Sequence, residues 1–169
     1  MNPMPISPYS IAKYSGELYA RMHMEQINKP IVVLRPFNAF GPYQSPRAVI
    51  SEIIETCLQG KVLRSTEGKQ TRDFNFVGNL VDGFILAAEK DEAIGKVINV
   101  GSGREISIRD LILTIHELTG SSSELQFGAL PIRPTEIWRM FAANERAANY
   151  LGWQPQISFE EGLRQTIDW

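Results

Sequence analysis

Tyr9 and Lys13 are the residues in this sequence whose types and spacing could support proton transfer. They lie four positions apart in SPYSIAKYSGELYA, residues 7–20, and on a helix this spacing places both side chains on one face. A free tyrosine has a pKa of about 10, but a neighbouring ammonium group favours the phenolate. The pair could therefore act as a general base on a substrate hydroxyl while hydride leaves the same carbon. From the spacing alone, a surface pair on an ordinary helix is the simpler interpretation.

The elements that must position this pair are helices and strands, which alternate along the chain. The continuous apolar run of residues 31–37 is typical of a strand buried on both faces of a parallel sheet. Asn79 and Ser107 are placed as helix N-caps, and Ser158 with Glu161 has the spacing of a capping box. The expected helices span about 8–28, 47–59, 79–90, 107–120, 144–153 and 158–169, and the expected strands span 31–37, 61–65, 72–77, 96–103 and 124–130. This alternation predicts an α/β fold.

Composition narrows the class of protein. The 169 residues are 43% hydrophobic, which suits one unit with a core, and the net charge of −2 gives no bulk reason to bind nucleic acid or an anionic membrane. The single cysteine, Cys57, falls in the apolar rhythm of a predicted helix, so we interpret it as a core residue in a reducing compartment. The sequence shows no signal peptide and no apolar run long enough to span a bilayer, which predicts a cytoplasmic location. His23 and His116 have no companions at ligand spacing, so no metal site is expected.

Six sequence blocks occur in an order that resembles a known family. They are SPYSIAKYSGELYA, LRPFNAFGP, TRDFNFV, VINVGSG, IRPTE and LGWQPQISFEEGL. Together they resemble the extended short-chain dehydrogenase/reductases, the NAD-dependent nucleotide-sugar epimerases and dehydratases. The resemblance covers essentially the whole chain, but only the second half of a typical member.

The resemblance implies a particular division of the chain. Residues 1–37 would be the catalytic helix and a strand of the Rossmann domain, and residues 38–169 would be mainly the nucleotide-sugar-binding subdomain, with 96–103 as a further sheet strand. The family's Gly-rich dinucleotide loop and its catalytic Ser or Thr would lie before Met1. The Gly-Ser-Gly sequence at residues 101–103 lacks the third glycine of that loop. The expected fold is thus the carboxyl-terminal part of a Rossmann-type enzyme without its dinucleotide-binding half.

The resemblance also implies site residues. Tyr9 and Lys13 would be catalytic and would contact the cofactor. Asn38 would donate to the diphosphate of the substrate, although a turn role before Gly41 is an equal alternative. Arg72 and Arg133 would hold the nucleotide, because arginine forks suit phosphates; a solvated surface arginine is the alternative for each. Glu136 would lie near the ribose hydroxyls, where the family more often has Asp. We interpret Arg35 as structural, closing the end of the sheet through an ion pair.

The implied function is that of part of an NAD-dependent nucleotide-sugar 4,6-dehydratase or 4-epimerase. The QSPRAVI and TRDFNFV blocks favour the dehydratase, but the nucleotide, the sugar and the reaction stay open. NAD would serve the full-length protein, and tight binding to these residues alone is not expected. The alternative is a non-catalytic nucleotide-sugar-binding or interaction module.

Self-association is a further expectation. The predicted first helix carries Leu18, Tyr19 and Met22 besides the Tyr9–Lys13 pair, which is more apolar surface than covering one strand requires. In the family this helix packs against its mate in a second subunit. We therefore expect a homo-oligomer formed through the N-terminal helix.

Overall fold

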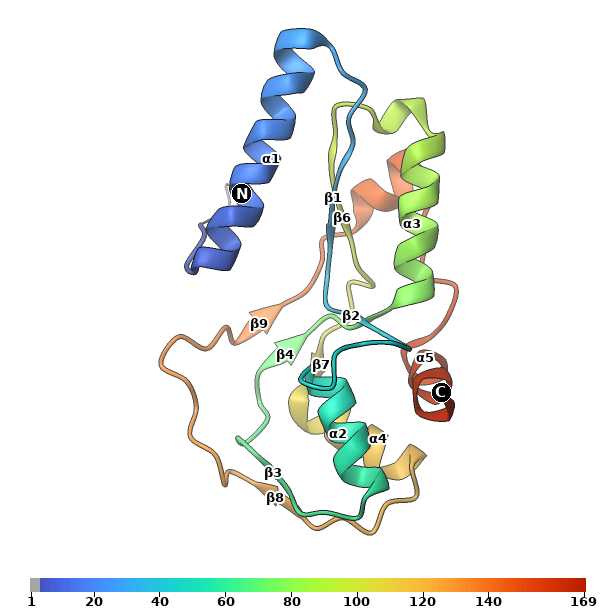
Figure 1. The fold of residues 1–169 in the computed structure, drawn as a ribbon. Helices are drawn as coiled ribbons and strands as arrows, with labels where there is room; N and C mark the ends of the chain where they lie inside the picture. Colours follow the sequence, from blue (N-terminus) through green and yellow to red (C-terminus); the bar gives the residue numbers. More distant parts are fainter. Residues whose placement is uncertain (1–3) are drawn as a thin grey trace.

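The computed structural model describes residues 4–169 as an α/β fold (Figure 1). The helices are α1 (Pro8–Ile27), α2 (Val49–Leu58), α3 (Val77–Glu89), α4 (Ile108–Leu118) and α5 (Phe159–Asp168), with a 3-10 turn η1 (Asp91–Ala93) and a π-helix η2 (Ala147–Leu151). The strands are β1 (Val33–Pro36), β2 (Ala39–Phe40), β3 (Leu63–Ser65), β4 (Thr71–Arg72), β5 (Asn75–Phe76), β6 (Val97–Val100), β7 (Ile106–Ser107), β8 (Leu125–Phe127) and β9 (Arg139–Met140).

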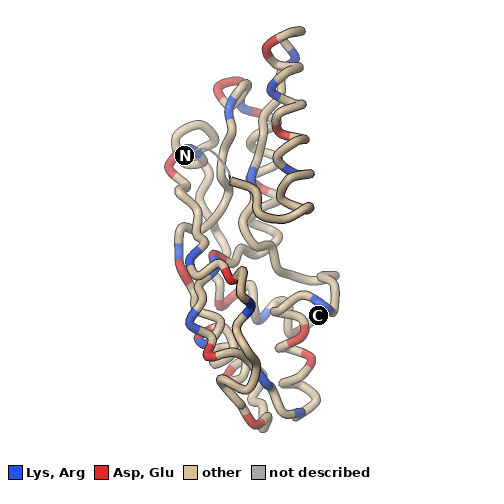
Figure 2. Tube along the Cα trace, turned by 90° about the vertical axis from the view of Figure 1, so that its left-hand side faces the viewer, with Lys and Arg blue, Asp and Glu red and all other residues tan. Residues whose placement is uncertain are grey.

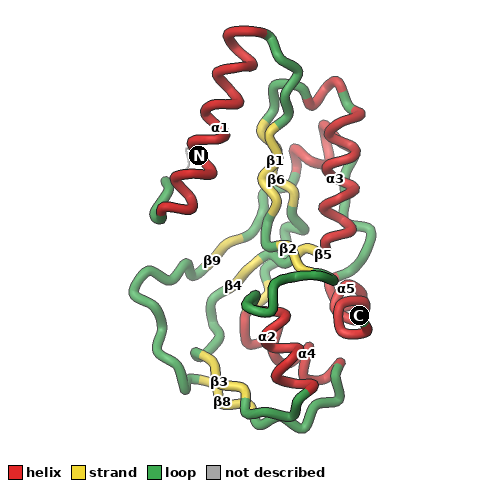
Figure 3. The backbone as a smooth tube through the Cα atoms, viewed as in Figure 1, coloured by secondary structure: helices red, strands yellow, loops and turns green. Residues whose placement is uncertain are grey.

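Within residues 4–169 the strands form four small sheets instead of one large one (Figure 3). Three of them are parallel pairs: β1 with β6, β2 with β5, and β3 with β8. In the fourth sheet β4 lies between β7, which is antiparallel to it, and β9, which is parallel. This last sheet matters for the site because it connects residues 71–72, 106–107 and 139–140.

Two groups of buried residues form the core. The larger is built from α2, α4 and α5 with the strands beside them, and the smaller joins β6 to α3 and η2, with partly buried Val32 and Leu34 packed against it. Helix α1 contributes to neither group, and in the view of Figure 1 it stands on the side of the β1–β6 pair away from α3. Charged residues of both signs are interspersed along the trace (Figure 2).

Several local expectations are confirmed. The Ser107 hydroxyl accepts from the Asp110 amide at the start of α4, and the Ser158 hydroxyl accepts from the Glu161 amide at the start of α5. Cys57 is a core residue with 2% of its surface exposed. Burial raises the pKa of its thiol above the ordinary value, which favours the unreactive protonated form.

Other expectations are wrong. Helix α3 begins two residues earlier than expected, and Asn79 is not its N-cap. Asn79 is instead buried, and its Oδ1 accepts from the amides of Gln156 and Ile157 at 3.0 and 2.9 Å. The expected strand at residues 72–77 is two short strands separated by Asp73 and Phe74, because both of these side chains turn into the interior. A helix is present within the range expected at 144–153, but it is largely π-helical.

Across residues 4–169, none of the helices combines the length and the apolar character that crossing a membrane requires.

Candidate functional site

Tyr9 and Lys13 lie together on an open face of α1. The helix begins at Pro8, so both residues fall in its first two turns. The Lys13 Nζ lies 5.5 Å from the centre of the Tyr9 ring, and 72% of the Tyr9 surface is exposed. Within residues 4–169 neither side chain takes part in a hydrogen bond or an ion pair. The phenol and the ammonium group are therefore both available to a bound molecule.

Helix α1 is attached to β1 through Glu17, its single buried residue. The Glu17 carboxylate accepts from Nε and Nη2 of Arg35, both at 2.8 Å, and from Nη2 of Arg21 at 2.7 Å. This confirms the structural interpretation of Arg35. Because Glu17 lies one turn beyond Lys13, and Arg35 lies three residues before Asn38, this ion pair links the helix that carries Tyr9 and Lys13 to the strand that leads to Asn38.

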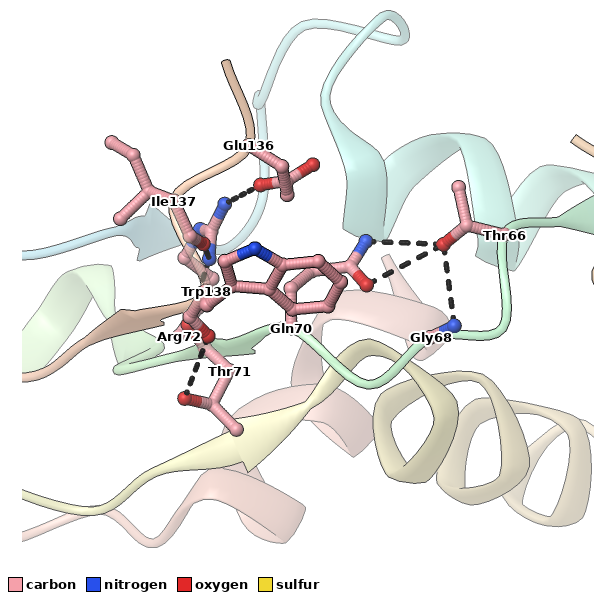
Figure 4. A network of polar contacts seen from close by, with 8 residues as sticks. All are labelled: Thr66, Gly68, Gln70, Thr71, Arg72, Glu136, Ile137 and Trp138. Carbon is pink, nitrogen blue, oxygen red and sulfur yellow. Dashed lines mark hydrogen bonds and ion pairs between the residues drawn. The ribbon is translucent and has the colours of Figure 1, made fainter. Parts of the chain in front are cut away.

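Arg72 and Glu136 are brought into direct contact, although they are far apart in the sequence. The Nη2 of Arg72 donates to Glu136 Oε1 at 2.6 Å, and its Nη1 donates to the carbonyl oxygens of Ile137 and Thr71 at 2.6 and 2.8 Å. Figure 4 shows this cluster, with the Trp138 indole beside it. Both side chains of the ion pair are mostly buried, at 18% and 14% exposure. The guanidinium therefore already holds the chain at Glu136 and Ile137 before any ligand is considered.

Asn38 and Arg133 are placed differently from this pair. The Asn38 Nδ2 donates to the carbonyl oxygen of Asp73, the residue that follows Arg72, at 3.2 Å. Arg133 is exposed, and its backbone carbonyl accepts from the Glu136 amide at 3.1 Å. In the part of the chain that the structure describes, its guanidinium makes no hydrogen bond or ion pair. The structure thus gathers Asn38, Arg72 and Glu136 around one segment and leaves the Arg133 charge open to solvent.

No hydrogen bond or ion pair within residues 4–169 joins Tyr9 or Lys13 to Asn38, Arg72 or Glu136.

Of the three tryptophans, Trp153 is buried, but Trp138 and Trp169 are 50% and 65% exposed.

Sequence reasoning missed Asp73. This residue is fully buried, and its carboxylate accepts five hydrogen bonds from residues 75, 102, 103 and 142. The Gly-Ser-Gly sequence at 101–103 was the available signal, since it folds around this carboxylate. Gly101 approaches so closely that a Cβ there would lie 2.9 Å from Asp73 Oδ2. Two glycines two residues apart therefore mark a carboxylate-binding turn here.

A second carboxylate, that of Glu105, bonds to two strands of the β7–β4–β9 sheet. Glu105 accepts from Arg139 Nε and Nη2 at 3.0 and 2.5 Å, and from the Thr71 hydroxyl at 2.7 Å. The hydrogen bonds from Arg139 and then Thr71 lower the pKa of Glu105 to about 2. This contact ties the segment before β7 to β4 and β9.

Comparison with known proteins places this fold in a class. The chain is similar to the crystal structure of a UDP-glucuronic acid 4-epimerase from Bacillus cereus in complex with UDP-glucuronic acid and NAD, with a TM-score of 0.90 and 33% identity over 99% of this chain and 54% of that one. It is 34% identical to a UDP-glucose 4-epimerase of Mycolicibacterium smegmatis over 97% of this chain and 53% of the relative. It is 31% identical to the human dTDP-D-glucose 4,6-dehydratase over 98% of this chain and 48% of the relative.

These matches and the observed fold define part of an extended short-chain dehydrogenase/reductase. A family model described as GDP-mannose 4,6 dehydratase matches residues 2–166. The chain belongs to this family, whose matched members include nucleotide-sugar 4-epimerases and 4,6-dehydratases. The chain spans about half the length of the relatives it matches.

Proposed function

We propose that this chain is the part of an NAD-dependent nucleotide-sugar 4,6-dehydratase or 4-epimerase that binds the sugar nucleotide and moves the proton. The observation that carries the proposal is the exposed Tyr9–Lys13 pair, in which the Lys13 Nζ lies 5.5 Å from the centre of the Tyr9 ring and neither side chain takes part in a hydrogen bond or ion pair within residues 4–169. A matched relative of each reaction type supports the same class of substrate.

The pair fits a role in proton transfer. In its phenolate form, Tyr9 takes the proton of a sugar hydroxyl at its oxygen and becomes neutral, and the Lys13 ammonium stabilises the negative charge that the phenolate carries before the transfer. The same two groups fit the ribose end of a nicotinamide nucleotide, because a phenol and an ammonium group open to solvent can donate to ribose hydroxyls. When bound, NAD supplies the acceptor for the hydride that leaves the sugar carbon.

Asn38, Arg72, Arg133 and Glu136 are proposed to hold the nucleotide diphosphate. Arg72 has five N–H groups, and the bonds to Thr71, Glu136 and Ile137 use three of them. Two N–H groups, one on Nε and one on Nη2, remain for phosphate oxygens. Arg133 offers its whole guanidinium, and Asn38 keeps one amide N–H beyond its bond to Asp73. The second oxygen of Glu136 is proposed to accept from a ribose hydroxyl.

The division of the chain follows from this proposal. Residues 1–37 would supply the catalytic helix and a Rossmann strand, residues 38–169 would mainly bind substrate, and 96–103 would add a strand. The pairing of β1 with β6 supports it, because residues 96–103 contain that partner strand.

Calorimetry with UDP and dTDP tests the binding part of the proposal. Arg133→Ala should weaken binding by about tenfold or more, since a charge-assisted hydrogen bond contributes roughly 1.5–3 kcal/mol. Its unfolding midpoint should not change, because the Arg133 side chain is exposed and unengaged within residues 4–169. Arg164→Ala is the matched control, since Arg164 is an exposed arginine of α5 with a single ion-pair contact of 3.9 Å. Equal affinity in both variants contradicts the assignment of Arg133.

The catalytic part has a separate test. These 169 residues alone, supplied with NAD, should convert no UDP-, dTDP-, CDP- or GDP-hexose into its 4-epimer or its 4-keto-6-deoxy product, because the sequence contains no Gly-x-Gly-x-x-Gly loop to hold the dinucleotide. Turnover by this chain would contradict the expectation that these residues are inactive on their own. Nucleotide binding by a full-length protein that also lacks turnover would favour the alternative of a non-catalytic binding module.

Self-association through α1 is also proposed. Ile11, Leu18, Tyr19 and Met22 are exposed on this helix at 53%, 48%, 63% and 37%, and soluble monomers rarely expose large contiguous apolar patches. Leu18→Glu should shift the mass measured by light scattering toward 19.0 kDa, whereas Val62→Glu, at an exposed apolar position outside α1, should not. A monomer mass for the unaltered chain at high concentration contradicts this proposal.

A further inference from the structure

Asp73 is a buried carboxylate held almost entirely by N–H groups. Its Oδ1 accepts from the Ser102 amide at 3.1 Å, from the Ser102 hydroxyl at 2.7 Å and from Asn75 Nδ2 at 2.9 Å. Its Oδ2 accepts from the amides of Gly103 and Ala142 at 2.9 and 3.0 Å. Within residues 4–169 no lysine, arginine or histidine forms an ion pair with it. A buried carboxylate without a cation is stable only where such donors surround it.

The five donors come from three separate segments of the chain. Asp73 and Asn75 belong to the β4–β5 region, Ser102 and Gly103 follow β6, and Ala142 follows β9. The carboxylate therefore holds the ends of β6 and β9 against the link between β4 and β5. Gly103 has a φ of +75°, a backbone conformation that favours glycine, and this directs its amide into the cluster.

The same cluster borders the candidate nucleotide site on two sides. Arg72 directly precedes Asp73, and the Asp73 carbonyl oxygen accepts from the Asn38 side chain at 3.2 Å. Strand β9, just before Ala142, follows the Glu136–Ile137 segment to which Arg72 donates. A change in the Asp73 cluster would therefore alter the relative placement of Asn38, Arg72 and Glu136.

We infer that Asp73 is the positioning residue of the nucleotide-diphosphate site, fixing the side chains of Asn38 and Arg72 relative to each other through its buried hydrogen bonds. This inference rests on the proposed function. It assigns Asp73 no contact with substrate, because the carboxylate is fully buried.

The test compares Asp73→Asn with the unaltered chain, using UDP as the probe. Asn preserves the size of the side chain but turns an NH2 group toward N–H donors, so at least one oxygen's hydrogen bonds are lost. Asp82→Asn is the matched control, because Asp82 is an exposed carboxylate of α3. UDP affinity should fall by about tenfold or more in Asp73→Asn and should not change in Asp82→Asn. Asp73→Asn that folds and binds UDP like the unaltered chain overturns the inference.

Nuclear magnetic resonance gives a readout that a purely structural role would not move. The Asn38 side-chain amide and the Arg72 Nε–H should both change chemical shift in Asp73→Asn, while amides in α2 and α4 keep theirs. If Asp73→Asn does not fold, Ser102→Ala replaces it, since this change removes the hydroxyl's 2.7 Å bond to Asp73 and the 3.1 Å bond that it accepts from the Arg104 amide, and leaves the backbone donors to Asp73 in place. Unchanged Asn38 and Arg72 signals in Ser102→Ala, with unchanged UDP affinity, overturn the inference.

The spectra also distinguish a failure of the proposed nucleotide site from a failure of the positioning role inferred for Asp73. If the unaltered chain does not bind UDP, the proposed nucleotide contact fails, and the Asn38 and Arg72 signals alone decide the role of Asp73. Shifted signals then support a positioning role, and unshifted signals refute it.

Discussion

Replacing Glu17 by Gln should release α1 without unfolding the rest of the protein. Glu17 is the buried residue of α1, and its carboxylate accepts three hydrogen bonds from Arg35 and Arg21. Neither core group contains a residue of this helix. The attachment of α1 therefore depends largely on one carboxylate, while the two cores do not depend on it.

The free-energy cost of Glu17→Gln depends on how deeply the carboxylate and its two arginine partners are buried. Removing one partner of a fully buried pair costs about 3–5 kcal/mol. Here the carboxylate is 6% exposed, but Arg35 and Arg21 are 34% and 43% exposed, so water can solvate both guanidinium groups once the carboxylate is gone. Discounting for this solvation leaves about 1–2 kcal/mol, which corresponds to roughly a fivefold to thirtyfold increase in the opening of α1.

Amide hydrogen exchange measures this opening directly. Protection of α1 amides should fall by about fivefold to thirtyfold in Glu17→Gln, and protection in α2 and α4 should not change. Glu25→Gln is the matched control, because it removes the same charge from an exposed position of the same helix. Equal α1 protection in the two variants would refute the reasoning, as would an equal loss of protection throughout the chain.

Three further substitutions probe the packing and the charges around the site. Asn79→Ala should lower the free energy of unfolding in urea by about 1–3 kcal/mol, because it removes a buried side chain that accepts from the part-buried amides of Gln156 and Ile157; a loss below about 0.5 kcal/mol would contradict the role assigned to this side chain. Gly162→Ala should cost about 1–3 kcal/mol in the same assay, since its Cβ would lie 2.8 Å from Phe76 Cβ and Cδ2; unchanged stability would show that α5 has room to move. The pKa of Glu105 is lowered to about 2 by Arg139 and Thr71, so its stabilising contribution is present above its unfolded pKa of about 4.3 and is lost as the pH falls toward 2. Glu105→Gln should therefore reduce the loss of the thermal midpoint between about pH 4.5 and pH 2, and an identical acid profile would argue against this contact.

Features that depend on neighbours along the chain were predictable from the sequence. Ser107 and Ser158 cap their helices because the hydroxyl and the amide that it meets are three residues apart. Cys57 and the apolar residues of α2 share one face because the helical repeat places them there. The Tyr9–Lys13 contact follows from the same repeat.

Other features required the folded chain. In the sequence Asn79 has the position of a helix cap. In the structure its side chain accepts from the amides of Gln156 and Ile157, which lie 77 and 78 positions further along the chain. The two oxygens of Asp73 are satisfied by donors up to 69 positions away. A buried polar group takes its partners from whatever segments pack around it, so its role cannot be obtained from spacing.

The sequence by itself determined the helical face that carries Tyr9 and Lys13, the principal helix caps, the α/β class and the family, because each depends on local spacing or on the order of short blocks. Only the tertiary structure decided how the site is assembled. It placed Arg72 against Glu136 across 64 positions and left Arg133 exposed. It also made Asp73 the link between three segments. The physical reason is that hydrogen bonds between distant residues exist only after the strands that carry them have packed together.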